Sequence, residues 1–295
     1  MMNDELNLQN CRVDAVNAFL KFHIKVDVWR LDLIHPVISG NKWFKLTEHL
    51  KDAQELNKST LLTFGGAYSN HIVATAAAAK KKGLACIGII RGEKPVEFSN
   101  TLIEAIRYGM KIHFVSWEEY KMKTIPAEVS LENVYVINEG GYGRKGAEGI
   151  YNLLRDIDYA AYTHILAAVG TGTSLAGLVA GSRSKQNIVG ISVMKNNLSL
   201  QEDIESLLDE KREFKLVHDY HFGGYAKYNA GLIQFMNEWY QITNIPSDFV
   251  YTGKLFFALS DLIQKNYFPP DSKLLVIHSG GLQGNRSLPK GTLIF

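Results

Sequence analysis

The chain has 295 residues, of which 46% are hydrophobic and 21% charged, and its formal net charge is +2 at pH 7. These values are typical of a soluble globular protein with one large or two smaller domains. They give no sign of a nucleic-acid or membrane partner, and no apolar segment is long enough to cross a bilayer. Two cysteines and nine scattered histidines predict neither a disulfide scaffold nor a metal site. Residues 1–5 are polar and do not resemble a secretory signal, so we expect a cytoplasmic protein.

Strand-like and helix-like segments alternate along the chain. Residues 22–30 alternate polar and apolar side chains, which predicts a strand with one solvent-facing side. Apolar runs predict buried strands at 60–64, 84–91, 111–115, 134–137, 164–169, 188–193 and 274–277. Periodic segments predict a helix that begins near Lys42 and further helices at 69–82, 96–108, 146–156, 198–209, 229–241 and 254–265, with one more that ends at Gly181.

Apolar strands that alternate with helices are typical of parallel sheets covered on both faces. We therefore predict an α/β fold with two lobes and a cleft between them. The larger lobe is expected to comprise residues 1–44 and 141–295, and the smaller, inserted lobe residues 45–140.

Three glycine-rich turns follow apolar strands, at residues 65–71, 170–174 and 280–281. In a parallel sheet such turns lie at the carboxyl ends of the strands, where ligands bind. The second turn leads into a helix whose free N–H groups and neighbouring hydroxyls predict an anion site, in particular for a phosphate. Gly172 is expected to let the backbone approach that phosphate closely. The alternative is a close helix–strand contact that requires small residues.

A nucleotide ligand is disfavoured by the same sequence. No Gly-x-x-x-x-Gly-Lys-Ser/Thr pattern occurs, which excludes a Walker loop. The glycines at 170, 172 and 177 are followed by a strand that ends in Val193-Met194-Lys195, so no carboxylate is available for a ribose.

A lysine stands where a loop turns into a helix, in the segment Ser-Gly-Asn-Lys-Trp-Phe-Lys-Leu at 39–46. Gly and Asn tolerate tight turns, so Lys42 can point into a cleft. The alternative is an ordinary solvated lysine at a helix start. Together with a phosphate site and no nucleotide signature, Lys42 suggests pyridoxal phosphate, which needs an amine for its aldehyde and a partner for its ring nitrogen.

Five motifs then occur in the order seen in one family: residues 39–46, Gly-Gly-Ala-Tyr-Ser-Asn-His at 65–71, Asn-Glu-Gly-Gly-Tyr at 138–142, Val-Gly-Thr-Gly-Thr at 169–173 and Val-Tyr-Thr-Gly-Lys at 250–254. The chain resembles the 1-aminocyclopropane-1-carboxylate deaminase/D-cysteine desulfhydrase family, from about residue 25 to residue 285. The resemblance implies the tryptophan synthase β-like fold (fold type II), pyridoxal 5'-phosphate as cofactor, and a homodimer.

The resemblance also implies how the cofactor is held. Lys42 is the Schiff-base lysine, and Lys45 is not. Asn70 contacts the ring hydroxyl, and Thr252 faces the ring nitrogen. The phosphate is held by four consecutive residues, Thr171, Gly172, Thr173 and Ser174.

For the substrate, the resemblance implies that Ser69, Asn70 and His71 receive the carboxylate of a small amino acid. A helix start with a serine hydroxyl is a reasonable carboxylate site. Tyr251 lies near the reacting carbon, so that Lys42, Ser69 and Tyr251 are the expected catalytic residues. The family usually has glutamine in place of Tyr68 and arginine near Val73, which implies an altered wall of the substrate pocket.

The expected reaction is β-elimination from a D-amino acid, with D-cysteine giving sulfide, pyruvate and ammonia. The alternative within enzymes is deaminating ring opening of 1-aminocyclopropane-1-carboxylate. In ring-opening members of the family, a glutamate follows the tyrosine that corresponds to Tyr251, whereas here Thr252 follows it. His71 stands where deaminases tend to have glutamine, and this difference also favours desulfhydration. The alternative from another class is a pyridoxal-phosphate-binding protein with little catalysis.

Overall fold

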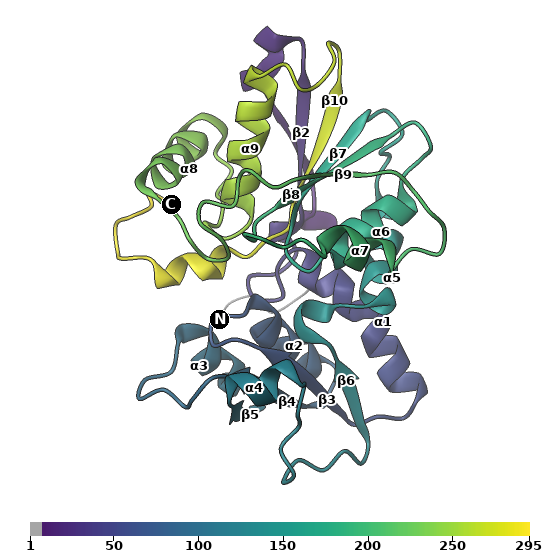
Figure 1. Cartoon of the computed structure of the whole chain (residues 1–295), viewed down its shortest axis with the longest axis vertical. Helices are drawn as coiled ribbons and strands as arrows, with labels where there is room; N and C mark the ends of the chain where they lie inside the picture. The colour runs from purple at the N-terminus through teal and green to yellow at the C-terminus, as the bar shows by residue number, and fades with distance from the viewer. Residues whose placement is uncertain (1–7) are drawn as a thin grey trace.

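Two separate β-sheets organise the chain (Figure 1). The larger has six strands in the order β1-β2-β10-β7-β8-β9, and the smaller has four in the order β5-β4-β3-β6. The computed structural model describes residues 8–295, without the side chain of Asp156. Residues 1–7, on which the expectation about a secretory signal rests, lie outside the described residues.

The larger sheet is parallel except at one edge, where β1 runs antiparallel to β2. Its strands are β1 (Val13–Val16), β2 (Lys25–Arg30), β7 (His164–Val169), β8 (Asn187–Ser192), β9 (Lys215–Val217) and β10 (Lys273–His278). The central strands β7, β8 and β10 carry apolar side chains on both faces, because helices cover the sheet on both sides.

The helices α8 (Ala230–Thr243) and α9 (Thr252–Gln264) lie on one face of this sheet, and α5 (Arg144–Leu153), α6 (Thr173–Gly181) and α7 (Leu200–Glu205) lie on the other (Figure 1). The long helix α1 (Asn41–Glu55) packs against α5. At their crossing a Cβ on Gly149 would lie 1.9 Å from the carbonyl oxygen of Phe44, so only glycine allows this close approach.

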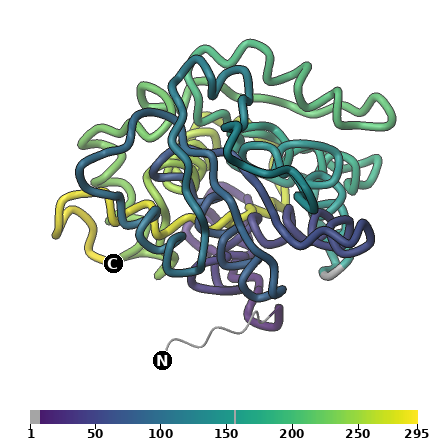
Figure 2. Tube along the Cα trace, turned by 90° about the horizontal axis from the view of Figure 1, so that it is seen from below, coloured from purple at the N-terminus to yellow at the C-terminus, as the bar shows by residue number. Residues whose placement is uncertain are grey.

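The smaller sheet is parallel throughout. Its elements are β3 (Thr60–Gly65), α2 (Asn70–Lys81), β4 (Ala85–Arg91), α3 (Asn100–Arg107), β5 (Met110–Val115), α4 (Trp117–Lys121) and β6 (Val134–Ile137). The alanines of α2 are buried against α1 and the sheet, since small side chains let the layers approach closely. Seen from the side of this sheet, the tube of these residues lies in front of the rest of the chain (Figure 2).

The α/β fold with parallel sheets flanked by helices is confirmed. The strand predicted at 22–30 begins only at Lys25, after a 3-10 helix (Asn17–Phe22), and its predicted solvent-facing side is wrong. Val28 and Trp29 are both buried, because β1 and β10 flank the strand and helices cover it.

The four strands of the smaller sheet all fall within the predicted inserted lobe, residues 45–140. The boundary after residue 44, however, lies inside α1, so the exact limits of the lobes stay a prediction. Within the described part of the chain, no helix is long and apolar enough to span a bilayer.

Candidate active site

A cavity of about 620 Å³ lies where the carboxyl ends of strands from both sheets meet. It is lined by the three glycine-rich turns, which follow β3, β7 and β10, and by the first turn of α1. The three turns, predicted to lie at the carboxyl ends of strands, thus border one common cavity.

Lys42 reaches this cavity because the chain turns sharply just before it. Gly40 has φ of +62°, and a Cβ there would lie 1.8 Å from the carbonyl oxygen of Ser279. The Asn41 N–H donates to that same oxygen at 3.2 Å, which ties the start of α1 to the turn after β10. The Lys42 Nζ donates to Asn41 Oδ1 at 3.0 Å and lies 5.8 Å from the ring centroid of Tyr251. Burial lowers the pKa of Lys42 to about 8, although Asp248 acts in the opposite direction.

Lys45, one turn further along α1, also lines the cavity. Its Nζ donates to the carbonyl oxygen of Gly140 at 3.2 Å. Burial, and secondarily the charge of Lys42, holds the pKa of Lys45 well below its ordinary value. Two buried amines of unusual acidity thus lie in one cavity, and their different hydrogen bonds distinguish them.

The start of α2 supplies polar groups that lack protein partners. Ser69 is the N-cap residue, and its side chain makes no capping hydrogen bond. Asn70 Oδ1 and His71 Nδ1 are buried without a hydrogen-bond partner among the described residues. His71 Nε2 lies 2.8 Å from Thr63 Oγ1, and burial holds the pKa of His71 well below 6.5, so the ring is neutral. Unsatisfied buried groups are costly, so this helix start is suited to a bound ligand.

Other predicted residues lie around this helix start. Tyr68 is at the rim of the cavity with 67% of its surface exposed. Val73 is fully buried in α2 and does not line the cavity, so it faces the core instead of a substrate.

The turn after β7 carries the four residues predicted to hold a phosphate. Thr171, Gly172 and Ser174 line the cavity, whereas Thr173 is buried and lies 3.2 Å from the Thr171 hydroxyl. Gly172 has φ of +85°, and a Cβ there would lie 2.5 Å from Ile204 Cγ1. A Cβ at Gly172 would therefore meet the core packing of α7, and the expectation that this glycine lets the backbone approach a phosphate stays a prediction.

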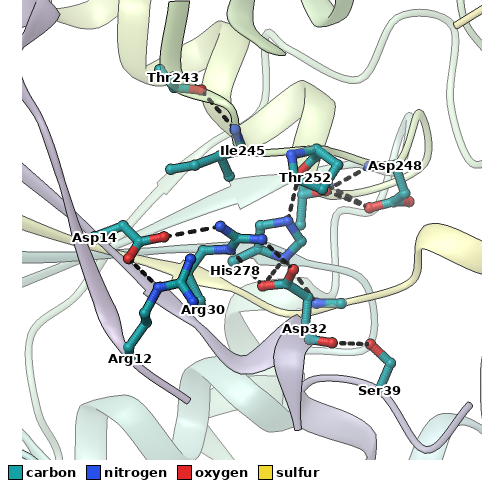
Figure 3. Close-up of polar contacts among 12 residues, drawn as sticks. Arg12, Asp14, Arg30, Asp32, Ser39, Thr243, Ile245, Asp248, Thr252 and His278 are labelled. Atoms are coloured by element: carbon teal, nitrogen blue, oxygen red, sulfur yellow. Dashed lines mark hydrogen bonds and ion pairs between the residues drawn. The ribbon is translucent and has the colours of Figure 1, made fainter. Parts of the chain in front are cut away.

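Tyr251 is held by a buried acid at the start of α9. The Asp248 carboxylate accepts N–H hydrogen bonds from Val250, Tyr251 and Thr252, at 3.0, 2.9 and 2.8 Å. It also accepts from the Thr252 hydroxyl at 2.7 Å (Figure 3). Thr252 is fully buried and does not line the cavity. Its predicted contact with the ring nitrogen of the cofactor therefore stays a prediction.

A network of polar side chains lies at the ends of β2 and β10 (Figure 3). The Arg30 guanidinium donates to both carboxylate oxygens of Asp32, at 2.9 and 2.7 Å, and to Asp14 at 3.0 Å. His278, at the end of β10, pairs with the carbonyl oxygen of Pro246 at 2.7 Å and accepts from the Gly280 N–H at 3.2 Å. This network supports the end of β2 and the end of β10, and the turn after β10 binds the start of α1, which carries Lys42.

Sequence reasoning missed several cavity-lining groups: Arg91, Glu139, Tyr225 and Ser279. Ser279 directly follows the last strand and could have been found from that position. The other three come from a strand end and from loops that the topology brings together, which no local pattern reveals.

The comparisons with known proteins agree with this geometry. Residues 19–280 match the family of pyridoxal-phosphate dependent enzymes. The chain belongs to this family.

A putative 1-aminocyclopropane-1-carboxylate deaminase of Pyrococcus abyssi is 31% identical over 88% of this chain and 86% of its own length. A D-cysteine desulfhydrase of Klebsiella pneumoniae is 28% identical over 87% of each chain. The crystal structure of an ACC deaminase homologue superposes with a TM-score of 0.81, at 29% identity, over 95% of this chain and 92% of that one. The predicted family resemblance and fold type are thereby confirmed.

The residues present fit pyridoxal phosphate as the cofactor. Lys42 offers an amine of lowered pKa, Asn70 offers an unpartnered buried oxygen, and the start of α6 offers free N–H groups beside hydroxyls. When bound, this cofactor supplies an electron sink for the bonds at the α-carbon of an amino acid.

Proposed function

We propose that the protein is a lyase of the D-cysteine desulfhydrase type, which converts D-cysteine and water into pyruvate, ammonia and hydrogen sulfide. The observation that carries the proposal is the cavity in which the Lys42 amine, the Tyr251 ring and the unpartnered groups at the start of α2 meet. These are an amine, an aromatic wall with a hydroxyl, and a carboxylate site, which are the groups that an elimination on an amino acid requires.

We assign the cofactor contacts as follows. Lys42 binds the aldehyde, Asn70 contacts the ring hydroxyl, and the phosphate lies at the turn formed by residues 171–174. Support for the turn comes from the start of α6, where N–H groups and the Thr171 and Ser174 hydroxyls border the cavity. For the ring nitrogen, Thr252 is the partner that the family resemblance implies. The Ser279 hydroxyl, which lines the cavity, is a second candidate for that contact.

The substrate carboxylate is received by Ser69 and the first N–H groups of α2, with Asn70 and His71 beside them. A neutral His71 can donate from one ring nitrogen while the other accepts. Tyr68 borders the entrance. Lys42 Nζ, once free, takes the proton from the α-carbon, and Tyr251 lies within reach of the same region.

Desulfhydration is preferred over ring opening because no carboxylate follows Tyr251. A carboxylate opposite a ring nitrogen favours its protonated form, which is the stronger electron sink. Here the Thr252 hydroxyl donates to Asp248, and the only acidic side chain that lines the cavity among the described residues, Glu139, pairs with Lys123 at 3.0 Å. A weaker sink suits a substrate such as D-cysteine, which has an acidic α-hydrogen, and disfavours a cyclopropane substrate, which has none.

The test compares D-cysteine, β-chloro-D-alanine and 1-aminocyclopropane-1-carboxylate as substrates of the purified, cofactor-loaded protein. We expect pyruvate release from the first two well above 2-oxobutyrate release from the third. Ring opening at an equal or greater rate would select the deaminase alternative. A coloured, cofactor-loaded protein without turnover on any small D- or L-amino acid would select a cofactor-binding protein with little catalysis.

We also propose that the protein is a cytoplasmic homodimer. The resemblance to the family supports the dimer, and the low cysteine content, with only Cys11 and Cys86, supports a reducing compartment. Light scattering is expected to give twice the mass of the 33.1-kDa chain. A monomeric mass at micromolar concentration would contradict the dimer, and recovery outside the cytoplasmic fraction would contradict the location.

A further inference from the structure

One positively charged side chain in the cavity has no counter-ion. Arg91 is the last residue of β4 and lines the cavity. Among the side chains that the structure describes, no carboxylate forms an ion pair or hydrogen bond with it. The nearby acid Glu139 is already paired with Lys123, at 3.0 Å. The positive charge of Arg91 is therefore available to a ligand.

Aromatic rings hold this guanidinium in place. Its central carbon lies 4.4 Å from the ring centroid of Trp117 and 5.5 Å from that of Tyr120. These cation–π contacts restrict the guanidinium without a hydrogen bond to its N–H donors, which stay available for a ligand. A fixed fork of N–H donors recognises a carboxylate, sulfonate, sulfate ester or phosphate with two parallel hydrogen bonds, at a reduced entropic cost.

The position of Arg91 separates it from the expected site of the α-carboxylate. A Cβ on Gly66 would lie 3.5 Å from Arg91 Nη2, so the fork borders the turn that precedes the start of α2. The Ser69 N–H donates to the carbonyl oxygen of Gly66 and closes this turn, so Arg91 borders the beginning of the turn whereas Ser69 and Asn70 lie at its end. Arg91 also acts on the other side of the cavity: desolvation raises the pKa of Tyr225, and the charge of Arg91 opposes that rise.

We propose that Arg91 binds a second anionic group, on the side chain of the amino-acid substrate, so that acidic amino acids are preferred over neutral ones of the same size. The proposal rests on the proposed function for the orientation of the substrate, with its α-carboxylate at the start of α2. It adds a substrate class: amino acids whose β-substituent carries a negative charge.

The binding experiment uses the cofactor-loaded protein and a matched pair of ligands without a leaving group, D-aspartate and D-asparagine, and their L-forms in parallel. Binding is followed by the change in the cofactor absorption and by calorimetry. We expect the carboxylate to be preferred by about 10- to 100-fold, the effect of a charge-assisted hydrogen bond. Arg91→Gln is expected to remove this preference and to leave D-asparagine affinity unchanged. Arg91→Lys, which keeps the charge but not the fork, should retain part of it.

Lys94→Gln is the matched control, because Lys94 is an exposed cation three residues away that does not line the cavity. It should keep the full preference. An equal loss of both ligands in Arg91→Gln would assign Arg91 to the α-carboxylate and overturn the proposal. A preference that persists in Arg91→Gln, or none in the wild type, would overturn it as well. Unchanged cofactor content in each variant shows that the fold is retained.

Turnover separates this proposal from the proposed function. D-serine O-sulfate and β-chloro-D-alanine both give pyruvate on elimination, and only the first carries a charged β-substituent. We expect Arg91→Gln to raise KM for D-serine O-sulfate about 10- to 100-fold and to change β-chloro-D-alanine little. If neither compound reacts in the wild type, the proposed elimination fails, while the D-aspartate preference still decides the role of Arg91.

Discussion

Replacement of Lys42 by alanine tests the centre of the proposed site. Burial lowers the pKa of Lys42 to about 8 from an ordinary value of 10.5. At pH 7 this leaves about 10% of the amine unprotonated, compared with about 0.03% for a solvated lysine, a gain of roughly 300-fold in the reactive form. The amine would thus attack an aldehyde at neutral pH far faster than a surface lysine.

The pKa alone does not select Lys42, because two other buried lysines are also unusually acidic. Burial lowers the pKa of Lys254 to about 8, and that of Lys45 well below its ordinary value. Lys254, however, does not line the cavity, and its Nζ donates to the carbonyl oxygens of His221 and Gly224 at 2.9 and 2.8 Å. Lys45 lines the cavity but is directed to Gly140. Geometry therefore selects Lys42.

The assay is borohydride reduction of the cofactor-loaded protein followed by peptide mapping. We expect the label on Lys42 alone, its loss in Lys42→Ala, and its retention in Lys45→Ala. Rebinding of pyridoxal phosphate to the apoprotein should accelerate as the pH rises through about 8 and then level off, because the unprotonated amine reacts. A label on Lys45 or Lys254, or a midpoint near 10.5, would refute the reasoning.

Three further substitutions test how the cavity is supported. Gly172→Val should lower the unfolding free energy by about 2–5 kcal/mol, because of strain at positive φ and a clash with Ile204. In urea titrations, the added substitution Ile204→Ala should restore part of this stability. Loss of the cofactor from a Gly172→Val protein of full stability would contradict the prediction. Lys254→Met should lower the unfolding free energy by about 1–3 kcal/mol, because it leaves two carbonyl oxygens unpaired. The control Lys265→Met, at an exposed lysine, should change this free energy by less than about 0.5 kcal/mol. Equal shifts of Tm in the two variants would contradict the prediction. Thr252→Val should cost about 1–2 kcal/mol through the lost hydrogen bond to Asp248. A changed cofactor spectrum would support Thr252 as the partner of the ring nitrogen, and an unchanged one would favour Ser279.

The sheets could be predicted because their strands are apolar throughout, and the glycine-rich turns because they follow those strands. The missed strands β1 and β9 have only four and three residues and are only partly buried, so no apolar run marks them. Helix α4 was also missed, although Ser116 and Glu119 form a capping box that indicates its start.

The side chains that complete the site were harder to predict. The orientation of the Thr252 hydroxyl depends on Asp248, four residues earlier, and on the fold of the loop between them. A motif can mark Thr252 as important, but it does not tell which side of the helix start the hydroxyl faces. Arg91 likewise gains its place only from the packing of Trp117 and Tyr120 beneath it.

The glycine-rich turns contact one another or the segments that carry Lys42 and Tyr251. Asn41 Nδ2 donates to Ser174 Oγ at 2.8 Å, which joins the start of α1, next to Lys42, to the turn after β7. A Cβ on Gly170 would lie 3.2 Å from the Tyr251 ring, and one on Gly281 would lie 3.1 Å from Asn70 Nδ2. Because these contacts join both sheets at their carboxyl ends, a shift of one turn displaces groups on the others. The glycines are thus required for the fit of the turns to one another, and the position of Lys42 relative to Tyr251 and the start of α2 follows from that fit.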